Sequence, residues 1–160
     1  MTGMLASAPQ RWSSPRWRLL SVIVVLALVV TGIMVSANAA KAYPRSSFSV
    51  GSSSDGRTAG NFVWYNRSVQ VGGTLYPSTS STILGAAVVF TVYHNSTVMS
   101  RAARPCDGCY RFHSQGSLGF GFTMSANVAG GATKIVVDIW LKGSTSVNAW
   151  KAYSKTYYRP

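Results

Sequence analysis

Two cysteines three positions apart are the residues of this sequence with the clearest chemistry. Cys106 and Cys109 flank Asp107-Gly108, a dipeptide that favours a turn and would bring the two thiols together. In an oxidising compartment such a pair forms a disulfide. We therefore predict a structural Cys106–Cys109 disulfide that closes a short loop.

The same thiols allow two other interpretations. A C-x-x-C pair serves redox catalysis at a helix N-terminus next to a βαβ unit, whereas the flanking sequence here is typical of strands and loops. The spacing C-x2-C-x3-H is also that of a zinc site, whose four ligands would be Cys106, Cys109, His113 and His94. Oxidised cysteines cannot bind zinc, so the expected site contains no metal and no cofactor.

Acidic residues are scarce. The chain has three, Asp55, Asp107 and Asp138, and no glutamate. A glycosidase needs a paired acid and base, and two of these aspartates stand in Asp-Gly turns. A hydrolase that pairs a serine with His94 or His113 is an alternative, although the G-x-S-x-G motif is absent. The sequence therefore predicts no catalytic residue.

Aromatic and basic side chains are the remaining candidates for a ligand surface. Aromatic rings on a sheet can stack on sugars or bases, although core packing accounts for many of them. From Ala40 to the end, 12 Lys and Arg stand against three Asp, a net charge of +9, which favours a polyanionic partner. The candidate ligand-surface residues are Trp64, Trp140, Trp150, Tyr153, Tyr157, Arg101, Arg104 and Arg111.

The elements that position these residues are short strands. Strand-like segments are expected over 62–71, 83–93, 97–103, 118–124, 135–141 and 147–158, with short ones at 74–76 and 110–113. Gly, Pro or Asn separates them, Gly72-Gly73 is read as a turn, and a bulge is expected in the last strand. About seven strands and no βαβ pattern predict an all-β fold: a single antiparallel β-sandwich, immunoglobulin-like or jelly-roll-like.

The cleanest alternation predicts the core. Residues 120–141 are expected to form a hairpin, and residues 83–93 a central strand. The predicted core residues are Leu118, Phe120, Phe122, Ile135, Val137, Ile139, Val88 and Phe90.

The N-terminal segment predicts export. Arg11, Arg16 and Arg18 precede an apolar run over residues 19–35, and small residues follow it. This is the pattern of a signal peptide over residues 1–39, with an uncleaved anchor as the alternative because the run approaches the ~17–25 residues of a spanning helix. Residues 40–61 are expected to be a Ser/Gly-rich leader, with at most an edge strand around Phe48–Val50, and residues 62–160 the β domain.

We therefore expect a small secreted or membrane-anchored protein whose domain lies outside the cytoplasm. Its expected function is non-enzymatic binding of an anionic cell-envelope polymer or a protein partner. No nucleic-acid motif is present, and membrane contact is expected only through the N-terminal segment. The alternatives are a small secreted hydrolase with a Ser/His site and a secreted membrane-active toxin or bacteriocin.

Overall fold

The computed structural model describes residues 43–106, 111–146 and 148–160. The strands of these residues are β1 (Arg45–Ser52), β2 (Gly56–Trp64), β3 (Ser68–Tyr76), β4 (Ile83–His94), β5 (Thr97–Arg104), β6 (Leu118–Ser125), β7 (Lys134–Gly143) and β8 (Trp150–Tyr158). The predicted signal peptide, residues 1–39, lies outside the described residues. Within the described part of the chain, no helix is both long and apolar enough to cross a membrane.

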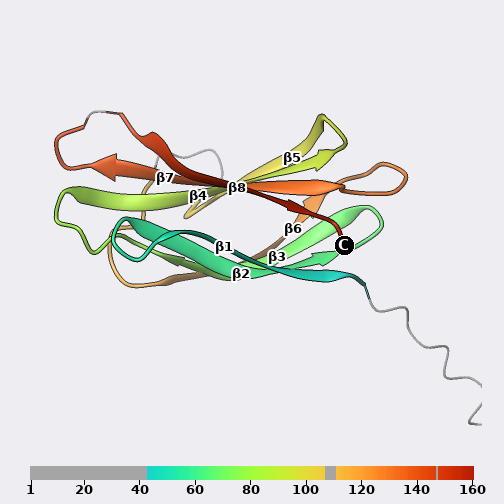
Figure 1. Cartoon of the computed structure of the whole chain (residues 1–160), viewed down its shortest axis with the longest axis horizontal. Coiled ribbons are helices and arrows are strands. Elements are labelled where there is room, and N and C mark those ends of the chain that lie inside the picture. Colours follow the sequence, from blue (N-terminus) through green and yellow to red (C-terminus); the bar gives the residue numbers. More distant parts are fainter. Residues whose placement is uncertain (1–42, 107–110, 147) are drawn as a thin grey trace, which may run out of the picture. The chain divides into compact units, whose positions relative to one another are not determined.

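The strands form two four-stranded antiparallel sheets that pack face to face (Figure 1). Sheet A has the order β1-β2-β3-β6, and sheet B has the order β5-β4-β7-β8. The predicted all-β sandwich is confirmed at this level. The most apolar strand, β4, is a central strand as predicted, and it lies between β5 and β7.

The predicted hairpin over residues 120–141 is wrong. Strand β6 pairs with β3 in sheet A, and β7 pairs with β4 and β8 in sheet B, so the chain crosses between the sheets after Ser125. Period-two alternation shows that each strand buries one face, but it does not identify the hydrogen-bonded neighbour. Here the two inner faces are buried against each other across the sandwich.

The predicted leader is also wrong, because the domain begins at Tyr43 rather than at Phe62. Strands β1 and β2 pair along their whole length, and the turn between them contains Gly51 and Gly56 at φ values of 92° and 115°. Serines on the outer side of β1 hid the pattern, since only Phe48 and Val50 face the core. The expected edge strand around these two residues is confirmed.

Gly72-Gly73 lies within β3 and is not the predicted turn, which falls instead at residues 65–67. Gly60 of β2 pairs with Gly73 of β3, and Phe48 and Phe120 flank them in the same row. A Cβ on Gly60 would lie 2.8 Å from the ring of Phe48, and one on Gly73 would lie 3.1 Å from the ring of Phe120. The two glycines therefore leave room for the aromatic rings of the edge strands.

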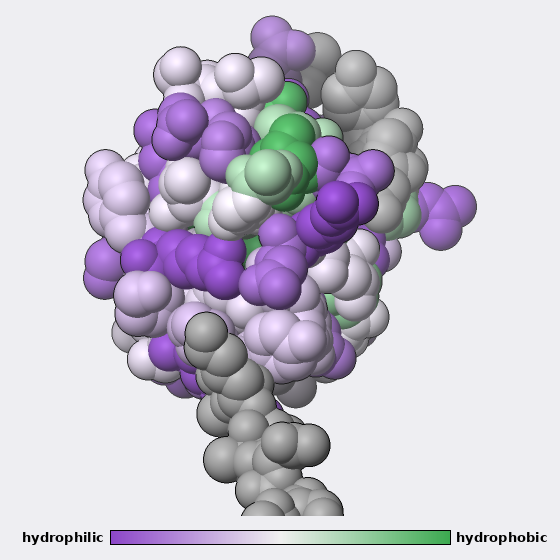
Figure 2. All heavy atoms as spheres, turned by 90° about the vertical axis from the view of Figure 1, so that its right-hand side faces the viewer, coloured by the Kyte–Doolittle hydropathy of each residue, from purple (hydrophilic) through white to green (hydrophobic). Residues whose placement is uncertain are grey.

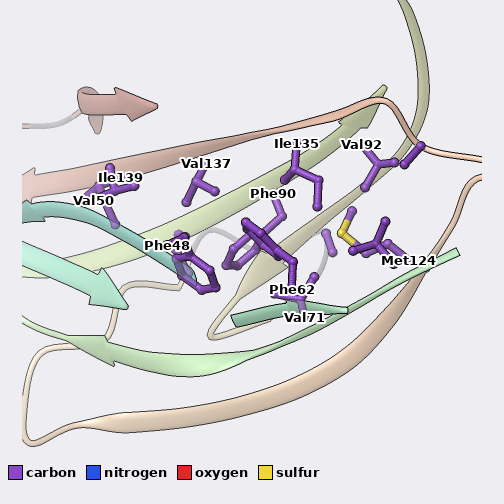
Figure 3. Packing of buried hydrophobic residues seen from close by; sticks show 14 of the residues in the cluster. Phe48, Val50, Phe62, Val71, Phe90, Val92, Met124, Ile135, Val137 and Ile139 are labelled. Atoms are coloured by element: carbon purple, nitrogen blue, oxygen red, sulfur yellow. The ribbon is translucent and has the colours of Figure 1, made fainter. Parts of the chain in front are cut away.

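Phe90 of sheet B packs against the aromatic rings of sheet A (Figure 3). Its ring centroid lies 5.6 Å from that of Phe48 and 5.5 Å from that of Phe120, both in edge-on geometry. Five predicted core residues are buried: Val88, Phe90, Ile135, Val137 and Ile139. The other three, Leu118, Phe120 and Phe122, are half-buried because β6 is an edge strand.

Candidate functional site

The outer face of sheet B carries the largest group of basic and aromatic residues. Along β7, Ile135, Val137 and Ile139 are buried, so the residues that alternate with them point away from the core. Residues paired across strands project to the same side, which places parts of β4, β5 and β8 on this face. Its side chains are Tyr93, Arg101, Lys134, Val136, Asp138, Trp140, Lys142, Lys151, Ser154 and Tyr158.

Three cations of this face, Arg101, Lys134 and Lys151, have an aromatic or polar neighbour. The Nζ of Lys134 lies 5.0 Å from the ring centroid of Tyr93, a cation–π distance. The Nε of Arg101 donates to Thr91 Oγ1 at 3.4 Å. Lys151 is paired in register with Trp140.

Asp138 is the acidic side chain of this face and is nearly buried. Ser154 Oγ donates to its Oδ1 at 2.6 Å, and Lys151 Nζ lies 3.9 Å from the same oxygen. A buried carboxylate is tolerated because these partners compensate its lost hydration. It therefore offsets about one cation and leaves Arg101, Lys134 and Lys142 as excess positive charge.

The structure does not place Trp64 on a ligand surface. Its side chain is wholly buried, and its Nε1 donates to Ser46 Oγ at 2.8 Å. Trp64 lies two positions after Phe62, which is also buried. The period of two along β2 therefore already assigned both side chains to one face, and the prediction for Trp64 is wrong.

Two predicted surface tyrosines connect the sheets instead. Tyr157 Oη donates to the carbonyl of Ser49 at 2.8 Å and accepts from the Ser49 amide at 2.9 Å. Tyr153 Oη donates to Asp55 Oδ2 at 2.6 Å. All three hydrogen bonds join β8 to the β1–β2 hairpin at one open edge of the sandwich.

The three arginines predicted to belong to the ligand surface do not lie on one face. Arg101 is exposed on the outer face of sheet B. Arg104 lies in the same row as the inward-facing Val88, and its guanidinium lies 4.0 Å from the ring centroid of Phe122. Arg111 is exposed in the connection between β5 and β6.

The two histidines lie at different ends of β4. His113 pairs with Ala86 near the start of that strand, while His94 is its last residue, roughly 26 Å away at ~3.3 Å per residue. His94 Nδ1 contacts the carbonyl of Gly131 at 2.7 Å, and His113 Nε2 contacts that of Gly116 at 3.2 Å. One zinc ion therefore cannot bind both histidines, and no group of three metal-ligating side chains occurs among the described residues.

The predicted disulfide falls partly outside the described residues. Cys106 is the cysteine that the structure describes. It is half-buried and is not a free thiol. Its expected partner, Cys109, is not among the residues described. The Cys106–Cys109 bond therefore stays a prediction.

Sequence reasoning missed a hollow at the end of the sandwich, lined by residues of the β1–β2 turn and the β7–β8 connection. Both segments lie on the left in Figure 1. The volume of the hollow is about 600 Å³. The residues that line it include Asp55, Thr82, Thr145, Trp150, Lys151 and Tyr153. These side chains come from three separate segments, and only the strand order brings them together. Figure 2 views the opposite end, which is mainly polar with one small apolar area.

The pKa of Asp55 is lowered from its ordinary value. The hydroxyl of Tyr153 is the largest cause, and the hydroxyls of Ser54 and Ser52 act in the same direction, while partial burial opposes them. All three hydroxyls donate to the ionised form and stabilise it. Asp55 is therefore a carboxylate at neutral pH with a fixed orientation.

This sequence and its fold were compared with known proteins in three ways. No protein-family model matches this sequence, no similar curated protein was found, and no solved structure matches the fold.

Proposed function

We propose that this is a non-enzymatic binding protein that acts outside the cytoplasm and binds an anionic polymer of the cell envelope through the outer face of sheet B. The observation that supports the proposal most directly is the charge of that face. Arg101, Lys134, Lys142 and Lys151 stand against Asp138, which is already paired with Ser154 and Lys151.

The arrangement of the cations favours a polymer over a small anion. Lys134 and Lys142 lie eight positions apart on β7, which is roughly 26 Å at ~3.3 Å per residue. A small anion would contact one of them, whereas an extended chain of phosphate or carboxylate groups can contact several at once. Trp140 lies between the two lysines on β7, Tyr93 is paired in register with Lys134, and both rings offer flat apolar surface to the polymer backbone.

The test is binding to immobilised lipoteichoic acid and dextran sulfate over a range of salt concentrations. The triple variant Arg101→Gln/Lys134→Gln/Lys142→Gln should lower affinity at least tenfold at low salt. Its matched control is Arg45→Gln/Arg57→Gln/Arg67→Gln, which removes the same charge from the other side of the domain and should lower affinity less than threefold. Binding of the unmodified protein should weaken as salt rises, because salt screens exposed charges.

Three outcomes would contradict the proposal. Equal losses in the two triple variants would show that only net charge matters. Salt-insensitive leakage of anionic lipid vesicles would favour the membrane-active toxin. Ester hydrolysis that disappears in His94→Ala or His113→Ala would favour the hydrolase.

Export and the disulfide are part of the same proposal. N-terminal sequencing of secreted protein should find a start near Ala40, or an intact anchor in the membrane fraction. Mass measurement before and after reduction should show a gain of two hydrogens from Cys106 and Cys109. Free thiols together with bound zinc would contradict the disulfide.

The finer fold proposal is a jelly-roll-like sandwich. Eight strands in two four-stranded sheets are typical of that architecture. The orders found here differ from the orders 1-2-5-4 and 3-6-7 of an immunoglobulin constant-type sandwich, and the jelly-roll-like proposal is supported by the number of strands in each sheet and not by their order.

A further inference from the structure

An exposed aromatic side chain, Trp150, lines the hollow at the end of the sandwich, and backbone lies beside its ring. Trp150 is 42% exposed. Gly143 lies beside its six-membered ring, and a Cβ at Gly143 would be 3.4 Å from Cη2 and Cζ3. The indole is therefore supported by backbone on one side and offers its remaining surface to a ligand.

A fixed carboxylate lines the same hollow. Asp55 Oδ2 accepts from Tyr153 Oη at 2.6 Å, and the Asp55 amide donates to Ser52 Oγ at 3.1 Å. The bond from Tyr153 fixes the Asp55 side chain, and the amide bond fixes the backbone of the β1–β2 turn. The hydroxyls of Tyr153, Ser54 and Ser52 together occupy three of the about four acceptor positions of the ionised carboxylate, which leaves one position open. It can accept a strong charge-assisted hydrogen bond from a hydroxyl group.

The other lining residues favour a polar but uncharged ligand. Thr82 and Thr145 contribute hydroxyl groups, and Lys151 contributes a positive charge that opposes that of Asp55. Because these two charges are opposite, the hollow has no net charge that would select a simple anion or a simple cation. The volume of about 600 Å³ lies within the range of ~300–1,000 Å³ typical of small-molecule sites.

We infer that this hollow binds the pyranose ring of an uncharged sugar, with Trp150 against the ring and Asp55 accepting from one of its hydroxyl groups. A pyranose has an apolar face of C–H groups and a rim of hydroxyl donors, which match an indole beside a carboxylate. Among the described residues Asp55 is the carboxylate of this hollow, so the site binds sugar without the acid–base pair that hydrolysis requires.

This site is distinct from the polyanion surface proposed above. It lies at the end of the sandwich, and Lys151 is the lining residue that also belongs to the outer face of sheet B. The two proposals can therefore fail separately. Loss of sugar binding should leave binding to dextran sulfate unchanged.

The experiment is a titration of the purified protein with cellotetraose, N-acetylchitotetraose and mannotetraose, followed by calorimetry and by the NMR signal of the Trp150 indole N–H. At least one of these sugars should bind with millimolar or better affinity and shift that signal. Trp150→Ala and Asp55→Asn should each weaken binding at least tenfold. Tyr43→Ala, which removes an exposed aromatic ring from the other end of β1, is the matched control and should change affinity less than twofold.

The folding of each variant is checked by its thermal midpoint and amide NMR spectrum. Thr82→Val is a second variant, because it keeps the shape of the side chain and removes a hydroxyl from the hollow; it should weaken binding several-fold. If none of the three sugars moves the Trp150 signal of the folded protein, or if binding persists in folded Trp150→Ala, the inference is wrong.

Discussion

Asp55 shows how a single side chain can serve both the fold and a site. Its hydrogen bond from Tyr153 joins the β1–β2 hairpin to β8, and the same bond lowers its pKa. Because its folded-state pKa lies below the ordinary value of about 3.9, Asp55 stabilises the folded chain above that pH. This contribution is lost as the pH falls through the folded-state pKa.

The first prediction concerns this bond. Tyr153→Phe removes the largest cause of the shift, so the pKa of Asp55 should rise toward its ordinary value, and the stability that Asp55 adds above that pH should shrink. The measurement is an NMR titration of the Asp55 side-chain carboxyl carbon. Tyr157→Phe is the control, because Tyr157 bonds to the backbone of Ser49 and should leave the pKa of Asp55 unchanged. Identical titration midpoints in Tyr153→Phe and the unmodified protein would contradict this assignment.

At the scale of the strands, glycine positions decide how the edge aromatics pack. A Cβ on Gly73 would lie 2.5 Å from the carbonyl oxygen of Ala59, whereas one on Gly72 would have open space around it. The two neighbouring glycines of β3 therefore have different structural roles. Gly73 permits a close approach of strands, and Gly72 points outward.

The second prediction compares these neighbours. Gly73→Ala should lower the free energy of unfolding by ~1–3 kcal/mol, because the strand must shift to relieve the overlap. Gly72→Ala should raise it by ~0.5–1 kcal/mol, because alanine loses less conformational entropy in a strand. Urea unfolding of both variants measures the difference. Equal changes in the free energy of unfolding would show that Gly60 and Gly73 do not make room for the aromatic rings of the edge strands.

Most strands could be predicted from alternation, but their partners could not. Phe120 and Phe122 on β6 and Ile135 and Val137 on β7 each show period two, yet the two strands belong to different sheets. Pairing depends on side-chain fit across the whole sandwich, which local periodicity does not contain. The hollow was missed for the same reason, since Asp55 and Trp150 meet only once β1 and β8 lie at the same edge. Trp64 is a different case, because its position relative to Phe62 already indicated burial.

At the scale of the whole molecule, the core is centred on Phe90 rather than on the β6 phenylalanines. Phe90 is completely buried and contacts aromatic rings from both edge strands of sheet A. Phe122 is half-buried and lies beneath the guanidinium of Arg104. The stability of the sandwich should therefore depend unequally on these two side chains.

The third prediction follows from this inequality. Phe90→Ala should lower the free energy of unfolding by ~3–5 kcal/mol, because it removes a buried ring and leaves a cavity. Phe122→Ala should lower it by ~1–2 kcal/mol, because its ring is only partly removed from water. Chemical denaturation of the two variants under identical conditions tests the order. A larger loss for Phe122→Ala would place the centre of the core on β6.

The fourth prediction concerns where the folded unit begins. A chain that starts at Tyr43 contains all of the described strands, whereas one that starts at Phe62 lacks β1 and most of β2. The longer chain should unfold in one cooperative transition with urea. The shorter chain should not fold, because it loses Phe48 and Val50 from the core and exposes the edge of β3. Circular dichroism and amide NMR dispersion distinguish the two states. A cooperative transition in the chain that starts at Phe62 would contradict this prediction and show that residues 43–61 are a dispensable leader. In that case β3, β6 and sheet B would bury enough apolar surface to fold without the N-terminal hairpin.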